Sequence, residues 1–133
     1  MAAITHDIPR GLFHVSEVDH NGKVFSPRIP HSAADSENMD IKRICFSTSI
    51  TGALRAIGPI YRMSGIYYVH VPDIDIRELY NSDKVLKPTV EDVFDVKSTR
   101  EKWVVADVNM KCIGVIRAKI NKRHRIEWRW LKM

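Results

Sequence analysis

The sequence predicts an α+β domain with few helices and a strand-rich second half. Short runs of β-branched and aromatic residues recur along the chain, and residues 50–57 have the apolar spacing of an amphipathic helix. The last strands are joined by connections too short for the crossovers of a parallel sheet. These three observations argue against a doubly wound parallel sheet.

A chain of 133 residues is expected to form one domain, 1–133, with a core of its own. Cys45 and Cys112 lie inside apolar runs, which is typical of reduced, buried thiols. No apolar segment approaches the roughly 20 residues that span a bilayer, and the first residues lack the pattern of a signal peptide. We therefore expect a cytoplasmic protein with no membrane partner.

The first half of the chain contains a short strand, a turn and a long loop. Residues 11–16, GLFHVS, alternate so that His14 shares a face with Leu12. Asn21-Gly22 indicates a turn. Residues 23–40 show no periodicity, and a loop of this length in a small domain is expected to cover a functional region.

Residues 42–59 are predicted to form a buried strand that leads directly into a capped helix. Residues 42–46 form the strand, and the hydroxyl side chains of residues 47–49 lie where the first helical N–H groups lack partners. The apolar positions of 50–57 share one face of the helix. Gly58 and Pro59 are expected to end it, because proline cannot extend the hydrogen-bond ladder.

The second half is predicted to be mainly strands. Segments 66–71, 103–108 and 111–120 are rich in β-branched residues, with a turn near Asn109 between the last two. Segment 124–131 alternates charged and apolar residues, as a half-buried strand does.

The segments between these strands are less defined. Residues 73–80 fit either helix or extended structure, and Pro72 is expected to end the strand before them. Residues 84–88 are assigned as a connection, and the pattern of 90–97 leaves its state open.

Positive charge is concentrated near the C-terminus. The formal charge is +5, and residues 111–133 contain eight Lys or Arg against one acid, Glu127. This cluster fits either an acidic or nucleic-acid partner, because clustered cations attract polyanions, or a solvated strand face. The residues assigned to the first alternative are Lys122, Arg123, Arg125 and Arg129.

Several classes of site lack their sequence patterns. No Cys or His occurs in a CxxC or HxxxH arrangement, so we expect no metal site. The two cysteines lie in apolar strands, which argues against a catalytic thiolate. No glycine-rich phosphate loop is present, so nucleotide hydrolysis of the usual kind has no support.

Three separated pieces remain as candidates for chemistry. His14 lies on the first strand near Ser16, the hydroxyl run begins at Ser47, and Glu101 precedes the strand that begins at Trp103. Each has an ordinary structural alternative: a hydrogen-bonded core histidine, a helix cap and a solvated carboxylate.

In this order the pieces resemble the ADP-ribosyltransferase fold, in particular its small histidine-containing branch. That branch includes rifampicin ADP-ribosyltransferase, the RNA 2′-phosphotransferases and the DNA-modifying thymidine ADP-ribosyltransferases. Leu12-Phe13-His14-Val15-Ser16 is similar to its L-Y/F-H-x-S/T strand, and Phe46-Ser47-Thr48-Ser49-Ile50 to its hydroxyl-rich turn. Glu101 stands where the family has its catalytic acid. The resemblance implies a split mixed or antiparallel sheet with few helices.

The resemblance also implies roles in binding and using NAD as a substrate. His14 would bind the adenosine ribose, and Arg28 or Arg43 would neutralise the pyrophosphate. Glu101 would orient the ribose 2′-hydroxyl and stabilise the cationic sugar that forms as nicotinamide leaves. The residues implied to contact or support NAD are His14, Ser16, Arg28, Arg43, Phe46, Ser47, Thr48 and Ser49.

The chain departs from the branch at two places. The tyrosine that often stacks on nicotinamide is replaced by Cys45 and Phe46, so stacking would come from Phe46, Tyr67 or Tyr68, or be absent. The Glu-x-Glu pair of arginine-modifying members is also absent. Arginine is therefore a poor candidate acceptor.

The expected function is transfer of ADP-ribose from NAD to a protein or nucleic-acid acceptor. Members of this size are common among phage and toxin-related proteins, which suggests action on a host or defence component. Two alternatives stay open: a non-catalytic nucleotide- or partner-binding module of the same fold that blocks a host factor, and a structural domain whose hydroxyl run is only a cap.

Overall fold

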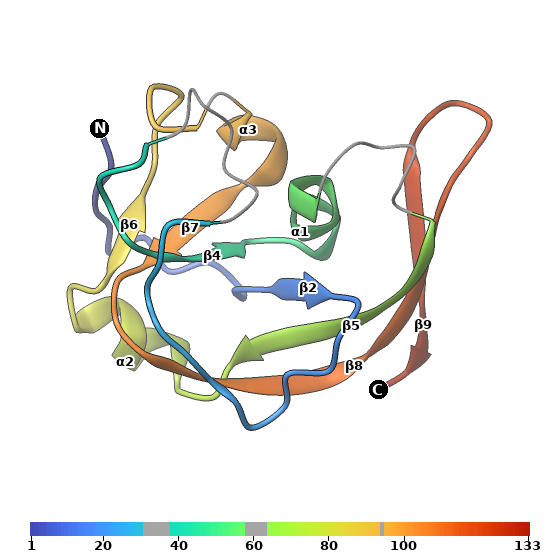
Figure 1. Ribbon diagram of the computed structural model, residues 1–133, viewed down its shortest axis with the longest axis horizontal. Coiled ribbons are helices and arrows are strands. Elements are labelled where there is room, and N and C mark those ends of the chain that lie inside the picture. The colour runs from blue at the N-terminus through green and yellow to red at the C-terminus, as the bar shows by residue number, and fades with distance from the viewer. Residues whose placement is uncertain (31–37, 58–63, 94) are drawn as a thin grey trace.

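The computed structural model describes residues 1–30, 38–57, 64–93 and 95–133 (Figure 1). Strands predominate, and the three helices of the described residues are short. The elements in chain order are β1 (Ala3–Ile4), β2 (His14–Ser16), β3 (Val24–Phe25), β4 (Ile44–Ser47), α1 (Ile50–Ile57), β5 (Gly65–Pro72), α2 (Ile76–Asn81), β6 (Val85–Lys87), α3 (Val96–Thr99), β7 (Glu101–Val104), β8 (Val108–Ile120) and β9 (Ile126–Lys132).

The described strands form two sheets, and their pairings are antiparallel. One sheet has the order β1-β6-β7-β4. The other has the order β2-β5-β8-β3, with β9 also paired to β8. This arrangement confirms the predicted α+β class with antiparallel strands and few helices.

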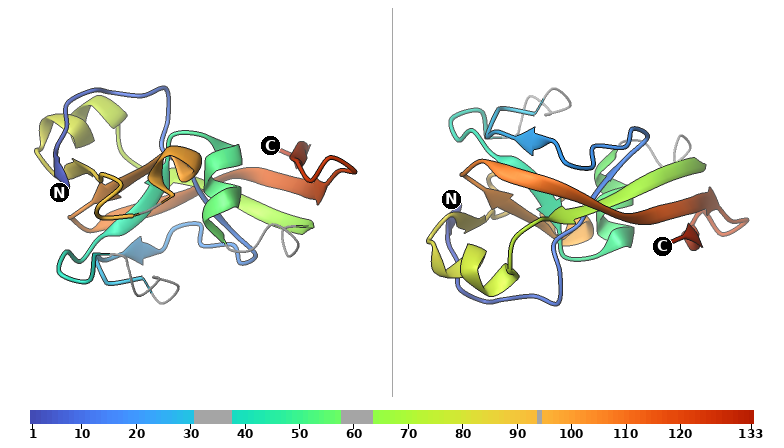
Figure 2. Two further views of the ribbon diagram at one scale, coloured as in Figure 1. Left: turned by 90° about the horizontal axis from the view of Figure 1, so that it is seen from above. Right: turned by 90° about the horizontal axis from the view of Figure 1, so that it is seen from below.

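A bridge at Phe13 and Ser47 connects the two sheets next to β2 and β4. The Phe13 N–H donates to the Ser47 carbonyl at 2.8 Å, and the Ser47 N–H donates back to Phe13 at 2.9 Å. Figure 1 shows β2 between β4 and the long β5–β8 pair, and Figure 2 shows the same ribbon from above and from below. The bridge therefore brings the ends of β2 and β4 together.

Among the residues that the structure describes, two apolar clusters fill the interior. One lies around β4, α2 and β6 and includes Leu12, Phe46 and Tyr80. The other packs α1 against β5 and β8 and includes Leu54 and Val69, which are fully buried. Burying an aliphatic side chain of this size contributes about 1.5–3 kcal/mol. These clusters fix the positions of β2, β4 and α1.

The central strand and helix form as the sequence predicts. β4 ends at Ser47 and α1 follows at Ile50. Ile50, Ala53 and Leu54 face the core, whereas Ile57 is 36% exposed. Gly58 and Pro59, expected to end the helix, lie outside the described residues.

Two sequence-based assignments are wrong. Residues 84–88 are not a simple connection, because Val85–Lys87 form β6 and Val85 is fully buried. The expected strand 103–108 ends at Val104, and Asn109 belongs to β8. β7 and β8 lie in different sheets, so the chain turns at 105–107 although its apolar pattern continues.

The segments left open also have defined structure. α2 begins within the ambiguous 73–80 segment, where the Asp75 carboxylate accepts hydrogen bonds from the N–H groups of Arg77 and Glu78. Residues 96–99 form α3. Among the described residues, no helix has the length and apolar character needed to cross a bilayer.

Candidate functional site

A cavity of about 780 Å³ lies where β2, β4, α1 and the 24–30 segment meet. Its volume is within the range of about 300–1,000 Å³ that is typical of small-molecule and cofactor sites. His14, Arg28 and Glu101 line it together with three aromatic side chains, Phe13, Phe25 and Phe46. The cavity thus combines apolar walls with a few polar groups.

The pairing of strands brings His14 and Glu101 to one cavity. Ser47, at the end of β4, lies opposite Glu101 of β7 in the sheet register. The same Ser47 forms the bridge to Phe13, and His14 is the next residue. His14 and Glu101 are therefore both placed close to Ser47, although they lie far apart in the sequence.

His14 is an uncharged ring at neutral pH. Burial, followed by the influence of the nearby His70, lowers the pKa of His14 to about 4, although a hydrogen bond with the Cys45 backbone acts in the opposite direction. The edge of Phe25 packs against the ring at a centroid distance of 5.4 Å. A neutral imidazole both donates and accepts hydrogen bonds, which suits sugar hydroxyls better than a charged phosphate.

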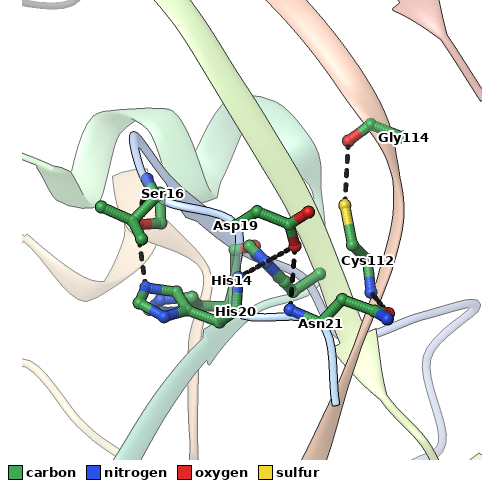
Figure 3. A network of polar contacts seen from close by, with 9 residues as sticks. His14, Ser16, Asp19, His20, Asn21, Cys112 and Gly114 are labelled. Atoms are coloured by element: carbon green, nitrogen blue, oxygen red, sulfur yellow. Dashed lines mark hydrogen bonds and ion pairs between the residues drawn. The ribbon is translucent and has the colours of Figure 1, made fainter. Parts of the chain in front are cut away.

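His20 and His70 lie beside His14. The backbone N–H of His20 donates to His70 Nε2 at 2.9 Å, and His70 Nδ1 lies 3.3 Å from the His14 carbonyl oxygen. These two bonds fix His70 as the neutral Nδ1–H tautomer, and burial lowers its pKa. Ser16 Oγ bonds to His20 Nε2 at 3.1 Å, as Figure 3 shows.

The Glu101 carboxylate contacts the buried Trp103, which in turn packs against the guanidinium of Arg43. The indole N–H of Trp103 donates to Glu101 Oε2 at 3.0 Å. The guanidinium of Arg43 lies 4.0 Å from the centre of the Trp103 ring. Arg43 Nη1 also donates to the carbonyls of Asn38 and Ile41, at 2.6 and 2.9 Å. The side chains that contact the Glu101 carboxylate are therefore themselves fixed by their neighbours.

The hydroxyl run serves mainly the junction between β4 and α1. Ser47 Oγ donates to the Thr99 carbonyl at 2.6 Å and accepts the Ser49 N–H at 3.3 Å. Ser49 Oγ accepts the Gly52 N–H at 2.9 Å, as an N-terminal cap does. Ser47 lines the cavity.

The structure separates the predicted NAD-contacting residues into two groups. Those that line the cavity are His14, Arg28, Arg43, Phe46, Ser47 and Glu101. Ser16, Thr48 and Ser49 are absent from the lining that the described residues provide, and they support neighbouring elements instead. Arg28 is exposed, whereas Arg43 is 1% exposed and bonded to backbone carbonyls. Arg28 is thus the better placed for a phosphate.

Sequence reasoning missed part of the cavity wall. Phe25 and His20 line it, and both follow the strand that carries His14. The aperiodic 23–40 loop was the available signal, because it was expected to cover a functional region. Tyr67 is buried in the core, and neither it nor Tyr68 is among the described lining residues.

The predicted basic residues lie at and after the turn of the β8–β9 hairpin. Lys122, Arg123 and Arg125 are exposed in the turn, and Arg129 is exposed on β9. Figure 1 shows this hairpin projecting at the edge of the molecule. It belongs to a surface distinct from the cavity.

No family model, curated protein or solved structure matches this chain. The functional interpretation therefore rests on the residues of the cavity and on their arrangement.

Proposed function

We propose that this protein is an NAD-dependent ADP-ribosyltransferase that acts on a protein or nucleic-acid acceptor. The observation that carries the proposal is the presence of His14 and Glu101 in the lining of one cavity of about 780 Å³. A neutral ring can hydrogen-bond the ribose hydroxyls of NAD, and a fixed carboxylate can stabilise the cationic sugar that this reaction forms.

The cavity offers a group for each part of NAD. The neutral His14 ring would bind ribose hydroxyls. The exposed guanidinium of Arg28 would pair with the pyrophosphate, for which a planar fork of donors is well suited. Phe25 and Phe46 provide flat apolar surfaces for the base or the nicotinamide.

Glu101 would act as nicotinamide leaves. The bond between the ribose C1′ and the nicotinamide nitrogen breaks, and its electron pair leaves with nicotinamide. Positive charge then develops on the sugar, and a fixed carboxylate stabilises this charge more than the neutral ribose of the ground state. A nucleophile of the acceptor attacks C1′ and loses its proton, which completes the transfer.

Calorimetry with NAD tests the binding part of the proposal. We expect wild type to bind NAD, and His14→Ala to weaken binding about 2- to 10-fold, since a lost hydrogen bond costs roughly 0.5–1.5 kcal/mol. His124→Ala, an exposed histidine of the hairpin turn, is the control and should bind as wild type does. Wild type that fails to bind NAD would favour a structural domain.

A non-catalytic module that binds an acidic partner is the second candidate. The hairpin places Arg117 of β8 opposite Arg129 of β9. Like charges directly opposite destabilise a sheet, and a polyanion would relieve this repulsion. Of the hairpin's charged residues, Lys119 and Glu127 form an ion pair at 3.6 Å.

Salt dependence tests this second candidate. We expect binding to single-stranded DNA to weaken steeply with salt, and loss of Arg125 and Arg129 to reduce the logarithmic salt slope by about one for each phosphate contact removed. Arg77→Ala with Lys84→Ala removes the same charge from the region of α2 and should keep the slope. Equal slopes for all three proteins would identify the hairpin as a solvated face.

A further inference from the structure

Asp19, His70 and Cys112 come together outside the lining of the cavity. One ligand atom from each side chain lies within 4.8 Å of the other two. The residues belong to the β2–β3 connection, β5 and β8, so they share no local sequence motif. Figure 3 shows Asp19 and Cys112 within one network of polar contacts.

The position of Cys112 beside His70 depends on an irregularity in the sheet. His70 pairs with Cys112, whereas the preceding Val69 pairs with Gly114. Ile113 is therefore skipped, as in a β-bulge, and bulges commonly change the direction of a side chain next to a site. His14, His70 and Cys112 consequently form a row across β2, β5 and β8.

The His70 ring is oriented as a metal ligand is. Its Nδ1–H is directed at the His14 carbonyl oxygen, 3.3 Å away, and its Nε2 lies 3.8 Å from Asp19 Oδ1. Metal-binding histidines commonly donate the second ring N–H to a backbone carbonyl, which fixes the tautomer and leaves the other nitrogen as a ligand. The His20 N–H bonded to Nε2 confirms that this nitrogen carries a lone pair.

The loop that carries Asp19 is tied to the strand that carries Cys112. Asp19 Oδ1 accepts the Asn21 N–H at 2.9 Å, and Asn21 Oδ1 accepts the Cys112 N–H at 2.9 Å. His70 is fully buried, while the Asp19 side chain is 51% exposed. An ion would enter from the Asp19 side and keep a position open to water.

We propose that Asp19, His70 and Cys112 form a binding site for a zinc ion. Imidazole, thiolate and carboxylate are the three ligand types that zinc takes in proteins. With Zn–S of about 2.3 Å and Zn–N or Zn–O of about 2.0–2.1 Å, ligand atoms around a tetrahedral ion lie roughly 3.3–3.6 Å apart. The three ligand atoms, which lie within 4.8 Å of one another, would have to move closer to reach this range.

Binding an ion requires two existing contacts to be given up. The Cys112 thiol donates weakly to the Gly114 carbonyl at 3.5 Å and would lose its proton. The His20 N–H would lose its bond to His70 Nε2. In exchange, the ion would fasten the loop that carries His20, a residue of the cavity wall, to β5 and β8.

Titration with Co²⁺ tests the site directly, because thiolate coordination produces an intense charge-transfer absorption band. We expect wild type to bind one Co²⁺ with this band and Zn²⁺ to displace it. Cys112→Ser should abolish the band. The control Cys45→Ser, which removes the other half-buried thiol, should keep it.

Asp19→Asn provides a second variant that keeps the shape of the exposed loop. It should retain the thiolate band and bind Co²⁺ about 10- to 100-fold more weakly, as expected for a weakened ligand set. Zn²⁺ should raise the melting temperature of wild type and Cys45→Ser, and not that of Cys112→Ser. Absence of the band in folded wild type, or its persistence in Cys112→Ser, would overturn the proposal.

Discussion

Trp103 is the residue that positions the Glu101 carboxylate, through the bond from Nε1 to Oε2 at 3.0 Å. Trp103→Phe keeps the ring beneath Arg43 and removes this donor. A hydrogen bond to a charged group contributes about 1.5–3 kcal/mol, so we expect kcat for ADP-ribose transfer to fall roughly 10- to 100-fold. KM for NAD should change little, because in the proposed reaction the carboxylate acts mainly in the transition state.

Trp128→Phe is the matched control for that measurement. Its indole N–H donates to Thr51 Oγ1 at 3.2 Å and lies outside the described cavity lining. Both variants lose one indole hydrogen bond, but only the change at Trp103 should lower kcat. Equal kcat for Trp103→Phe and wild type would show that Trp103 does not position Glu101 for catalysis.

Asp92 gives the protein a pH-dependent contribution to stability. Burial raises the pKa of Asp92, but hydrogen bonds from the Thr89 backbone and from the Asn38 and Thr89 side chains outweigh this effect and lower it overall. A lowered pKa in the folded state stabilises the fold above the unfolded value, about 3.9, and this stability is lost as the pH falls through the folded value.

We expect Asp92→Asn to reduce the free energy of unfolding by about 1–3 kcal/mol at neutral pH, since its carboxylate accepts three hydrogen bonds. The difference from wild type should shrink as the pH falls below the unfolded value of about 3.9 and through the lowered folded value, because the wild-type carboxylate is then protonated as well. Urea unfolding at neutral pH and across this acidic range measures this. Asp107→Asn, at an exposed position, should show neither effect.

The contact of α1 with β4 depends on the absence of a side chain at Gly52. A Cβ there would clash with Ser47 Oγ and lie 2.5 Å from the Thr99 carbonyl oxygen. Alanine favours a helix by about 1 kcal/mol over glycine, but overpacking against a fixed backbone costs about 1–3 kcal/mol or more. We therefore expect Gly52→Ala to lower the free energy of unfolding.

Ala56→Gly, at an exposed position of the same helix, measures the effect of helix propensity without the effect of packing. It should cost about 1 kcal/mol in thermal or urea unfolding. If Gly52→Ala instead stabilised the protein, α1 would not pack against Ser47 and Thr99 as described.

The apolar periodicity of the sequence predicted the regular helix and strands. It failed for a very short strand and where the chain passes from one sheet to the other. The helix 50–57 and the strand at 66–71 were predicted because their apolar spacing is local information. β6 was missed because a three-residue strand has too few positions to show a period. The turn at 105–107 was missed because an apolar run does not reveal that its two halves join different sheets.

The candidate sites differ in how far the sequence predicts them. His14 and Glu101 are the first residues of β2 and β7, and each belongs to a short motif of the sequence, so their chemistry could be proposed from the chain alone. Phe25 could not, because it comes from an aperiodic loop. The cluster of Asp19, His70 and Cys112 was missed as well, since its members lie on three separate segments and only the folded sheet pairs them.

At the scale of the whole molecule, the cavity lies where the two sheets meet. The bridge between Phe13 and Ser47 joins them, and the pairing of Ser47 with Glu101 extends the connection to β7. His14 of β2 and Glu101 of β7 thus both line this cavity. We propose that these two groups act on one molecule of NAD.

Transfer of label from NAD to an acceptor in a cell lysate tests this claim most directly. Glu101→Gln preserves the size of the side chain and an oxygen that can accept the Trp103 N–H, and removes the charge. We expect labelling to fall at least about 100-fold, the scale of losing one electrostatic stabiliser of a transition state. NAD affinity should stay within a few-fold of wild type, and Glu91→Gln, an exposed change, should label normally. Undiminished labelling by Glu101→Gln would show that the Glu101 carboxylate does not take part in the transfer.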